Sequence, residues 1–172
     1  DINKIAFTGS TQVGKLIQKS LAGRDVGLTL ELGGKAANIV YEDAAIDQAV
    51  EGVVNGIFFN QGHVCCAGSR LLLQESIHDE FVKKLEKRMQ SLRVGNPLDK
   101  NTDIGAINSK EQLDKITGLV NEGLEDGGEL FQTECELPGN GFWFRPTLFT
   151  NVQPSYSIAR EEIFGPVLTT LT

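Results

Sequence analysis

The sequence predicts an α/β fold with a largely parallel sheet. Segments with strand-like composition alternate with amphipathic helical patterns along the chain, and Gly, Pro or Asn separates many of them. No internal repeat or low-complexity stretch interrupts this order. With 172 residues, an apolar share of 40% and a charged share of 23%, the chain has the size and composition of an ordinary globular domain with a core of its own.

The first part of the chain predicts a strand, a helix and two further strands. Residues 2–7 precede the turn Thr8-Gly9-Ser10, and a helix capped by Ser10 or Thr11 should follow. Residues 28–32 and 36–41 are the next strand candidates, with Gly33-Gly34 between them. Gly23 is the expected stop of the helix, whose inward face should consist of Val13, Leu16, Ile17 and Leu21.

Three more helices and three more strands are expected after residue 42. Asp43 should cap the first helix, and Ser76 with Asp79 and Ser109 with Gln112 resemble the capping boxes that open the other two. The strands are expected at 70–74, 142–149 and 166–171, with a loop at 60–67, a break at Asn96-Pro97 and a helix end at Gly127-Gly128. The predicted inward faces of the three helices are Ile46, Val50, Val53, Val54 and Ile57; Phe81, Leu85, Met89 and Leu92; and Leu113, Ile116, Val120 and Leu124.

Charge and cysteine content exclude several classes of function. The net charge is −7 with both signs interspersed, so the chain lacks the concentrated Lys and Arg of a nucleic-acid or anionic-membrane surface. No apolar run reaches the length that spans a bilayer. Three cysteines, two of them adjacent, do not make a disulfide framework, which favours a reducing compartment, either the cytosol or the mitochondrial matrix. The start at Asp1, almost directly before a strand, indicates a piece of a longer protein.

The turn between the first strand and helix is a candidate anion site. Residues 9–15, GSTQVGK, nearly match the phosphate loop of nucleoside triphosphatases. The match fails at Leu16, which has no hydroxyl to hold magnesium, so we reject that function. The N–H groups at a helix start still favour an anion.

Residues 58–70, FFNQGHVCCAGSR, form the most informative loop. Small residues surround Cys65 and Cys66, and backbone N–H groups beside a thiol stabilise both a thiolate and an oxyanion. The alternative is a pair of buried, unreactive cysteines. A zinc site is disfavoured because the chain has two histidines and no Cys-x-x-Cys pair. His63 is a further candidate to activate Cys65, although a triad would need an orienting group.

Glu31 is the candidate general base. It interrupts the apolar segment 28–32 directly before a glycine pair, at the strand end where active sites of parallel sheets gather. A carboxylate partly removed from water at such a place can take a proton from a reacting group.

Four segments, in this order, resemble the motifs of the aldehyde dehydrogenase superfamily. They are residues 7–14, FTGSTQVG; 30–35, LELGGK; 58–70; and 161–167, EEIFGPV, and the similarity also runs between them. The resemblance implies an α/β fold in which residues 1–34 are the C-terminal end of a Rossmann-like cofactor-binding domain. Residues 35–172 would be the N-terminal part of the catalytic domain, a parallel sheet with flanking helices. Family members are much longer, so we expect little activity from these residues alone.

The resemblance also implies an activity and its residues. An aldehyde is oxidised to a carboxylic acid with NAD, or NADP, through a thiohemiacetal and a thioester on a cysteine. Cys65 would be the nucleophile and Glu31 the base that activates water. The parent protein is expected to be a homo-oligomer, a dimer or tetramer, that acts on a small-molecule aldehyde. The implied cofactor contacts are Gly9, Ser10, Val13, Leu32, Glu162 and Phe164.

The chain departs from the family pattern at one position, and two alternative functions remain open. The family usually has Gln or Glu where this chain has His63. The first alternative is a non-catalytic scaffold domain of aldehyde dehydrogenase type, against which the retained Glu31, Cys65 and Glu162 argue. The second is a cysteine esterase that needs no cofactor.

Overall fold

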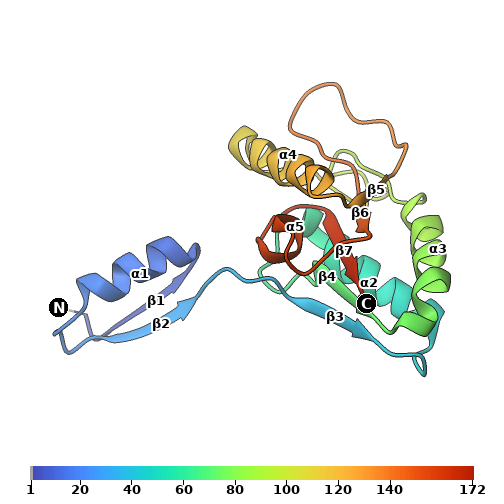
Figure 1. Cartoon of the computed structure of the whole chain (residues 1–172). Helices are drawn as coiled ribbons and strands as arrows, with labels where there is room; N and C mark the ends of the chain where they lie inside the picture. The colour runs from blue at the N-terminus through green and yellow to red at the C-terminus, as the bar shows by residue number, and fades with distance from the viewer. Residues whose placement is uncertain (1) are drawn as a thin grey trace. The chain divides into compact units, whose positions relative to one another are not determined.

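The computed structural model describes residues 2–172, which form two compact units divided between Gly34 and Lys35 (Figure 1). The division falls at the predicted domain boundary. The assignment of the two units to a cofactor domain and a catalytic domain stays a prediction.

The smaller unit, up to Gly34, is a single strand–helix–strand element. Strand β1 (Lys4–Thr8) pairs in parallel with β2 (Gly27–Glu31), and helix α1 (Thr11–Ser20) connects them (Figure 1). As predicted, Ser10 is the N-cap of α1: its Oγ accepts a hydrogen bond from the Val13 N–H (3.3 Å). The predicted inward face is wrong in part, since Leu16 is 66% exposed. Two strands offer too little surface to cover the apolar face of a helix.

The larger unit, Lys35–Thr172, contains a five-stranded sheet with the order β3-β4-β7-β6-β5. All neighbouring pairs are parallel except β5 with β6. The strands are β3 (Ala37–Val40), β4 (Arg70–Leu73), β5 (Glu129–Gln132), β6 (Thr147–Thr150) and β7 (Val167–Leu171). The helices are α2 (Ile46–Phe58), α3 (His78–Met89), α4 (Lys110–Glu125) and the short α5 (Ser157–Arg160), with 3-10 turns η1 (Phe59–Gly62) and η2 (Glu75–Ile77).

Two hydrophobic cores lie on opposite faces of this sheet. Alternate residues of a strand belong to different cores, because side chains alternate across a sheet: Leu71 and Leu73 pack with α2 and α3, whereas Leu72 packs with α4 and α5. The predicted inward residues of α3, including Phe81 and Leu85, are fully buried. In α4 the prediction fails at Leu124, which is 46% exposed near the end of the helix.

Two of the three predicted helix caps in this unit are wrong. Helix α2 begins after Ala45 without a side-chain cap, so Asp43 lies too far upstream. The Ser76 hydroxyl donates to Glu42 (2.9 Å) instead of capping α3, which follows directly from the 3-10 turn η2. Ser109 does cap α4 by accepting from the Gln112 N–H (3.1 Å).

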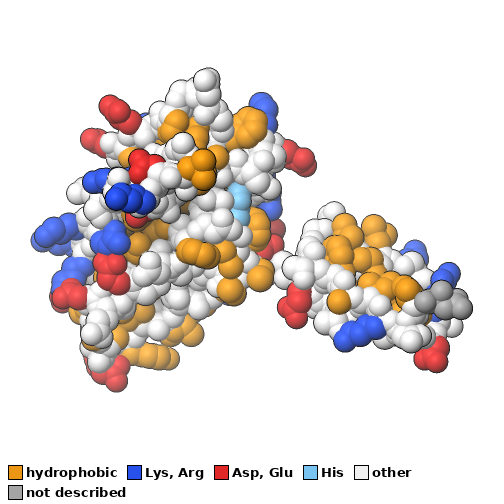
Figure 2. Space-filling view, turned by 180° about the vertical axis from the view of Figure 1, so that it is seen from behind, with side chains coloured by type: hydrophobic (Ala, Val, Ile, Leu, Met, Phe, Trp, Pro, Cys, Tyr) orange, Lys and Arg blue, Asp and Glu red, His pale blue; other side chains and the backbone are white. Residues whose placement is uncertain are grey.

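The late strands also differ from the prediction. The expected strand at 142–149 is shortened to β6, because Pro146 has no N–H to donate to a ladder and pairing begins at Thr147. The antiparallel edge strand β5 was not predicted. Among the described helices none has the length and apolar character that a membrane crossing requires. Acidic and basic side chains are interspersed over the face shown in Figure 2.

Candidate active site

The glycine turn of the smaller unit is tied to the end of β2. The Gly9 N–H donates to the Glu31 carbonyl oxygen (3.0 Å). A Cβ on Gly14 would lie 2.5 Å from Leu32, so this helical glycine lets α1 approach the Leu32 side chain closely. The five predicted site residues of the smaller unit are Gly9, Ser10, Val13, Glu31 and Leu32. A backbone bond joins Gly9 to Glu31, the helix cap joins Ser10 to Val13, and Leu32 packs against the turn residue Gly14.

Two predicted site side chains of this unit, Val13 and Glu31, are open to solvent. Val13 in the first turn of α1 is 42% exposed, an apolar surface beside N–H groups that favour an anion. Glu31 is also exposed at the end of β2, so the expectation that it is partly removed from water is wrong for this unit. Within this two-stranded unit, no other element covers the carboxyl end of β2, where Glu31 lies.

The cysteine loop begins with an unusual backbone. Directly after α2 the chain passes through Asn60, Gln61 and Gly62 with φ values of 49°, 48° and 75°. Consecutive left-handed residues other than glycine are costly and persist only where the surroundings fix them. Here the His63 N–H donates to the Asn60 carbonyl (2.9 Å), and the Asn60 side-chain amide donates to the His63 carbonyl (3.2 Å).

The far end of the same loop is anchored to the sheet. The Asn38 amide on β3 donates to the Gly68 carbonyl (3.1 Å), and a Cβ on Gly68 would lie 2.2 Å from that amide nitrogen. Thr169 on β7 donates from its hydroxyl to the Ser69 carbonyl (3.2 Å). Both ends of the loop are thus fixed.

Cys65 and Cys66 lie between these anchors and are both exposed, and neither forms a disulfide. The alternative that both cysteines are buried is therefore wrong for residues 2–172. An exposed thiol on a fixed turn is accessible to a small electrophile and has backbone N–H groups beside it.

The segment 161–167 packs directly against the cysteine loop. A Cβ on Gly62 would lie 2.2 Å from the Gly165 carbonyl oxygen, so the two backbones are in contact. The rings of His63 and Phe164 stack with their centroids 5.4 Å apart and their planes 9° from parallel. The structure thus brings the loop of Cys65 together with the segment of Glu162 and Phe164. This is expected if two motifs that are far apart in sequence form one site.

Helix α4 holds three consecutive carbonyls of that segment. The Gln112 amide donates to the carbonyls of Ile163 (2.8 Å) and Phe164 (3.0 Å). The Lys115 ammonium donates to the Glu162 carbonyl (2.8 Å). The sequence suggested that Gln112 caps its own helix, and nothing in the pattern indicated its actual partner 51 residues away.

Lys35 is a further group that the sequence did not single out. Its Nζ is buried and, among residues 2–172, has no hydrogen-bond partner. Burial and then the charge of Arg70 lower the pKa of Lys35 from 10.5 to about 8, although Glu162 and Glu161 act in the opposite direction. A lysine directly after Gly33-Gly34 was the available signal.

The Nε2 atom of His63 does not activate a thiol. This nitrogen is buried and has no hydrogen-bond partner within the described part of the chain, which excludes a bond from it to Cys65. Burial lowers the pKa of His63 below its ordinary value, which favours the neutral ring.

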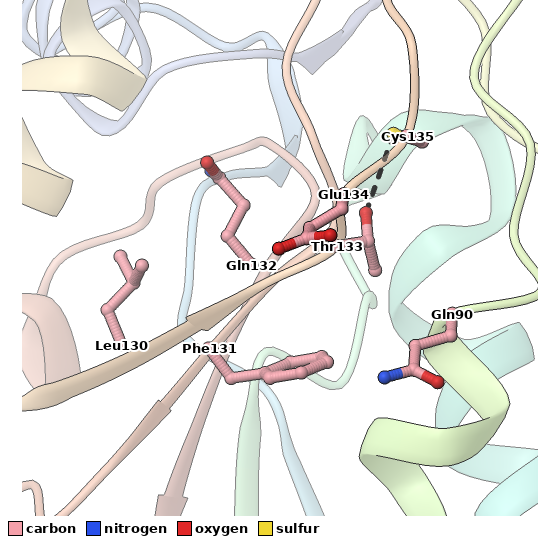
Figure 3. A pocket seen from close by; sticks show the side chains of 7 residues that line it. All are labelled: Gln90, Leu130, Phe131, Gln132, Thr133, Glu134 and Cys135. Atoms are coloured by element: carbon pink, nitrogen blue, oxygen red, sulfur yellow. Dashed lines mark hydrogen bonds between the residues drawn. The ribbon is translucent and has the colours of Figure 1, made fainter.

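A cavity of about 590 Å³ lies at the β5 edge and is lined by Gln90 and residues 130–135 (Figure 3). The Thr133 hydroxyl donates to the Cys135 Sγ there (3.5 Å), and none of the predicted site residues lines the cavity. Across residues 2–172 no three His, Cys, Asp or Glu side chains are grouped so that they could hold a metal ion.

Comparison with known proteins places this site in a family. The chain matches the model of the aldehyde dehydrogenase family over residues 1–172, and it belongs to this family. It is 50% identical over 171 residues to retinal dehydrogenase 2 of Taeniopygia guttata, covering 96% of this chain and 32% of that protein. It is 45% identical over 169 residues to cytosolic 10-formyltetrahydrofolate dehydrogenase of Xenopus laevis, covering 98% of this chain and 19% of that protein.

Solved structures agree. The NAD-dependent aldehyde dehydrogenase of Sinorhizobium meliloti superposes with a TM-score of 0.93 at 42% identity, over 98% of this chain and 34% of that one. Betaine aldehyde dehydrogenase of Staphylococcus aureus, solved in complex with NAD+, gives a TM-score of 0.91 at 36% identity, over 98% of this chain and 34% of that one. The predicted α/β fold with parallel strands and flanking helices is confirmed. The chain spans about a third of the length of these structures.

Proposed function

We propose that these residues belong to a longer NAD(P)-dependent aldehyde dehydrogenase that oxidises a small-molecule aldehyde to its carboxylic acid. The observation that carries the proposal is the exposed Cys65 on a fixed turn, in a loop packed against the segment of Glu162 and Phe164. The family membership supports it, as do the NAD-dependent enzymes among the similar structures. Within that protein, residues 1–34 would end the cofactor domain and residues 35–172 would begin the catalytic domain.

The residues present suit a nicotinamide dinucleotide. The start of α1 favours a pyrophosphate, and the exposed Val13 offers an apolar contact beside Gly9 and Ser10. In the larger unit the Glu162 carboxylate is an acceptor for ribose hydroxyls, and the Phe164 ring is a flat surface for a planar base. Leu32 would complete the apolar lining. The bound cofactor would supply the hydride acceptor.

In the proposed mechanism the Cys65 thiolate attacks the aldehyde carbon and forms a thiohemiacetal. The Cys65 backbone N–H stabilises the oxyanion that develops on the former carbonyl oxygen. Loss of hydride from the same carbon leaves a thioester on Cys65. Glu31 then takes a proton from water. The resulting hydroxide forms a bond to the thioester carbon as the carbon–sulfur bond breaks, which gives the carboxylic acid and the free Cys65 thiolate.

The nucleophile is tested in the full-length protein with two matched variants. Cys65→Ser should abolish aldehyde oxidation, because a serine hydroxyl without an adjacent base is a poor nucleophile. Cys66→Ser, a change of the same kind at the neighbouring exposed thiol, should retain most of the rate. The reverse pattern would transfer the role to Cys66.

Two measurements separate this function from its alternatives. A scaffold domain would not be labelled at Cys65 by an aldehyde-mimicking electrophile, as judged by intact mass. A cofactor-independent esterase would not bind NAD, whereas we expect NAD to change the fluorescence of Trp143 in the full-length protein. We further propose a homo-oligomer, a dimer or tetramer, that works in a reducing compartment such as the cytosol or the mitochondrial matrix, because all three cysteines are free.

A further inference from the structure

The stacked pair His63 and Phe164 joins two segments that are about a hundred residues apart in sequence. The ring centroids are 5.4 Å apart and the planes differ by 9°, which is an offset parallel stack. Phe164 has a φ of 56°, a conformation that a bulky residue adopts only where its surroundings impose it.

The backbone and the side chain of Phe164 are held by different partners. Gln112 and Lys115 on α4 bind the carbonyls of residues 162–164, which fixes the path of the main chain. These bonds leave the ring free to rotate about its side-chain torsions. The aromatic partner that the structure gives this ring is His63, whose own backbone is fixed by the turn at Asn60.

We propose that His63 is a positioning residue that holds the Phe164 ring, through this offset parallel stack, in the orientation that the cofactor contact requires. This inference rests on the proposed function, since it concerns the ring assigned there to the nicotinamide side. It gives a role to the residue at which this chain departs from the usual Gln or Glu of the family.

The ring of His63 carries this role, and its nitrogens do not. The Nε2 atom is buried without a hydrogen-bond partner in the described chain, so the site satisfies the flat face of the imidazole and leaves its polar atom unused. Burial also lowers the pKa of His63, which keeps the ring uncharged near neutral pH. A side chain with the same flat face and no nitrogen should therefore replace it, whereas a Gln side chain has no ring to stack.

The test uses the full-length protein with His63→Gln, which removes the ring, and His63→Phe, which keeps the ring and removes the nitrogens. Each is measured for NAD affinity by calorimetry, for the KM of NAD and of the aldehyde, for kcat, and for the rate at which an electrophile labels Cys65. His78→Gln serves as the control, because His78 lies at the start of α3 and its ring contacts the carboxylate of its neighbour Asp79 (2.9 Å).

We expect His63→Gln to weaken NAD binding about 3- to 10-fold, the range that one aromatic pair accounts for. The KM of the aldehyde and the labelling of Cys65 should stay unchanged, and His63→Phe should restore NAD affinity to within about 2-fold of the wild type. A purely structural role would instead alter all four quantities and the thermal stability together.

Three results would overturn the inference. Wild-type affinity in His63→Gln would show that the stack does not position Phe164. A His63→Phe variant as weak as His63→Gln would assign the role to the nitrogens, and slower labelling of Cys65 in both variants would make His63 part of the thiol chemistry. If the wild-type protein itself binds no NAD, the proposed function fails and this inference fails with it.

Discussion

Replacing Lys35 with methionine should stabilise the chain in a pH-dependent way. Burial and the charge of Arg70 lower the pKa of Lys35 from 10.5 to about 8 in the folded chain. The difference is about 2.5 pH units, and at about 1.4 kcal/mol for each unit it corresponds to roughly 3 kcal/mol. This is the cost that the folded state bears when Lys35 is charged, since the buried ammonium has no hydrogen-bond partner among residues 2–172.

The sign of the pH dependence follows from the proton balance. Below a pH of about 8, Lys35 is charged in both the folded and the unfolded chain, and the folded state bears the full cost. Between about 8 and 10.5 the unfolded chain binds more protons, so the free energy of unfolding rises with pH. Above 10.5 the lysine is neutral in both states and the cost is gone.

Urea unfolding followed by circular dichroism at pH 7, 8, 9 and 10 measures this effect as a difference between variants. The free energy of unfolding of Lys35→Met should exceed that of the wild type by about 3 kcal/mol at pH 7, and this difference should shrink toward pH 10. Lys100→Met, at an exposed loop position, is the matched control and should show no such trend. A Lys35→Met variant that is less stable than the wild type at pH 7 would contradict this expectation, because it would mean that the charged lysine has a stabilising partner.

The remaining predictions concern packing. Gly62→Ala should displace the cysteine loop and abolish aldehyde oxidation by the full-length protein, since the new Cβ would lie 2.2 Å from a backbone oxygen and φ is 75°. Gly118→Ala, in the exposed face of α4 with open space around it, is the control and should stabilise the chain by about 0.5–1 kcal/mol in urea unfolding. Gln112→Ala should lower the free energy of unfolding by about 1–3 kcal/mol in the same assay, because the carbonyls of Ile163 and Phe164 lose their donor. An unchanged urea midpoint would show that water replaces the amide. Phe81→Ala, at a fully buried position, should cost about 3–5 kcal/mol, and a loss below 1 kcal/mol would contradict the observed core.

Periodicity and motif order predicted most of the larger unit. The stripe of α3 is buried as expected because its spacing matches one face of a helix. The sheet is parallel except at β5, because most of its strands alternate with helices. The cap at Ser109 was correct and the cap at Ser76 was wrong, although the two local patterns are similar, with Asp79 in place of the Gln that follows Ser109. The difference is the tertiary partner Glu42, which binds the Ser76 hydroxyl and is 34 residues away.

In the candidate site, too, local sequence patterns predicted some features, whereas contacts between residues far apart in sequence were not predicted. The pair Cys65 and Cys66 was found from the small residues around it, and both thiols are exposed. The choice of Cys65 as the nucleophile rests on the resemblance to the family and stays a prediction. The stack of His63 on Phe164 and the grip of Gln112 on the same segment join residues 101 and 52 positions apart. No periodicity or turn signal encodes such contacts, because they arise only when α4 and the cysteine loop both pack against the segment 161–167 in the folded unit.

We propose that Cys65 carries the acyl group of the substrate and that Glu31 activates the water that releases it. The most direct measurement uses full-length Glu31→Gln in a Cys66→Ser background, incubated with NAD and an aldehyde, quenched with acid and mapped by peptide mass. We expect the peptide containing Cys65 to gain the mass of the acyl group and to keep it, because the water that should release it is no longer activated. Unmodified Cys65 in protein that has turned over the aldehyde would contradict these roles.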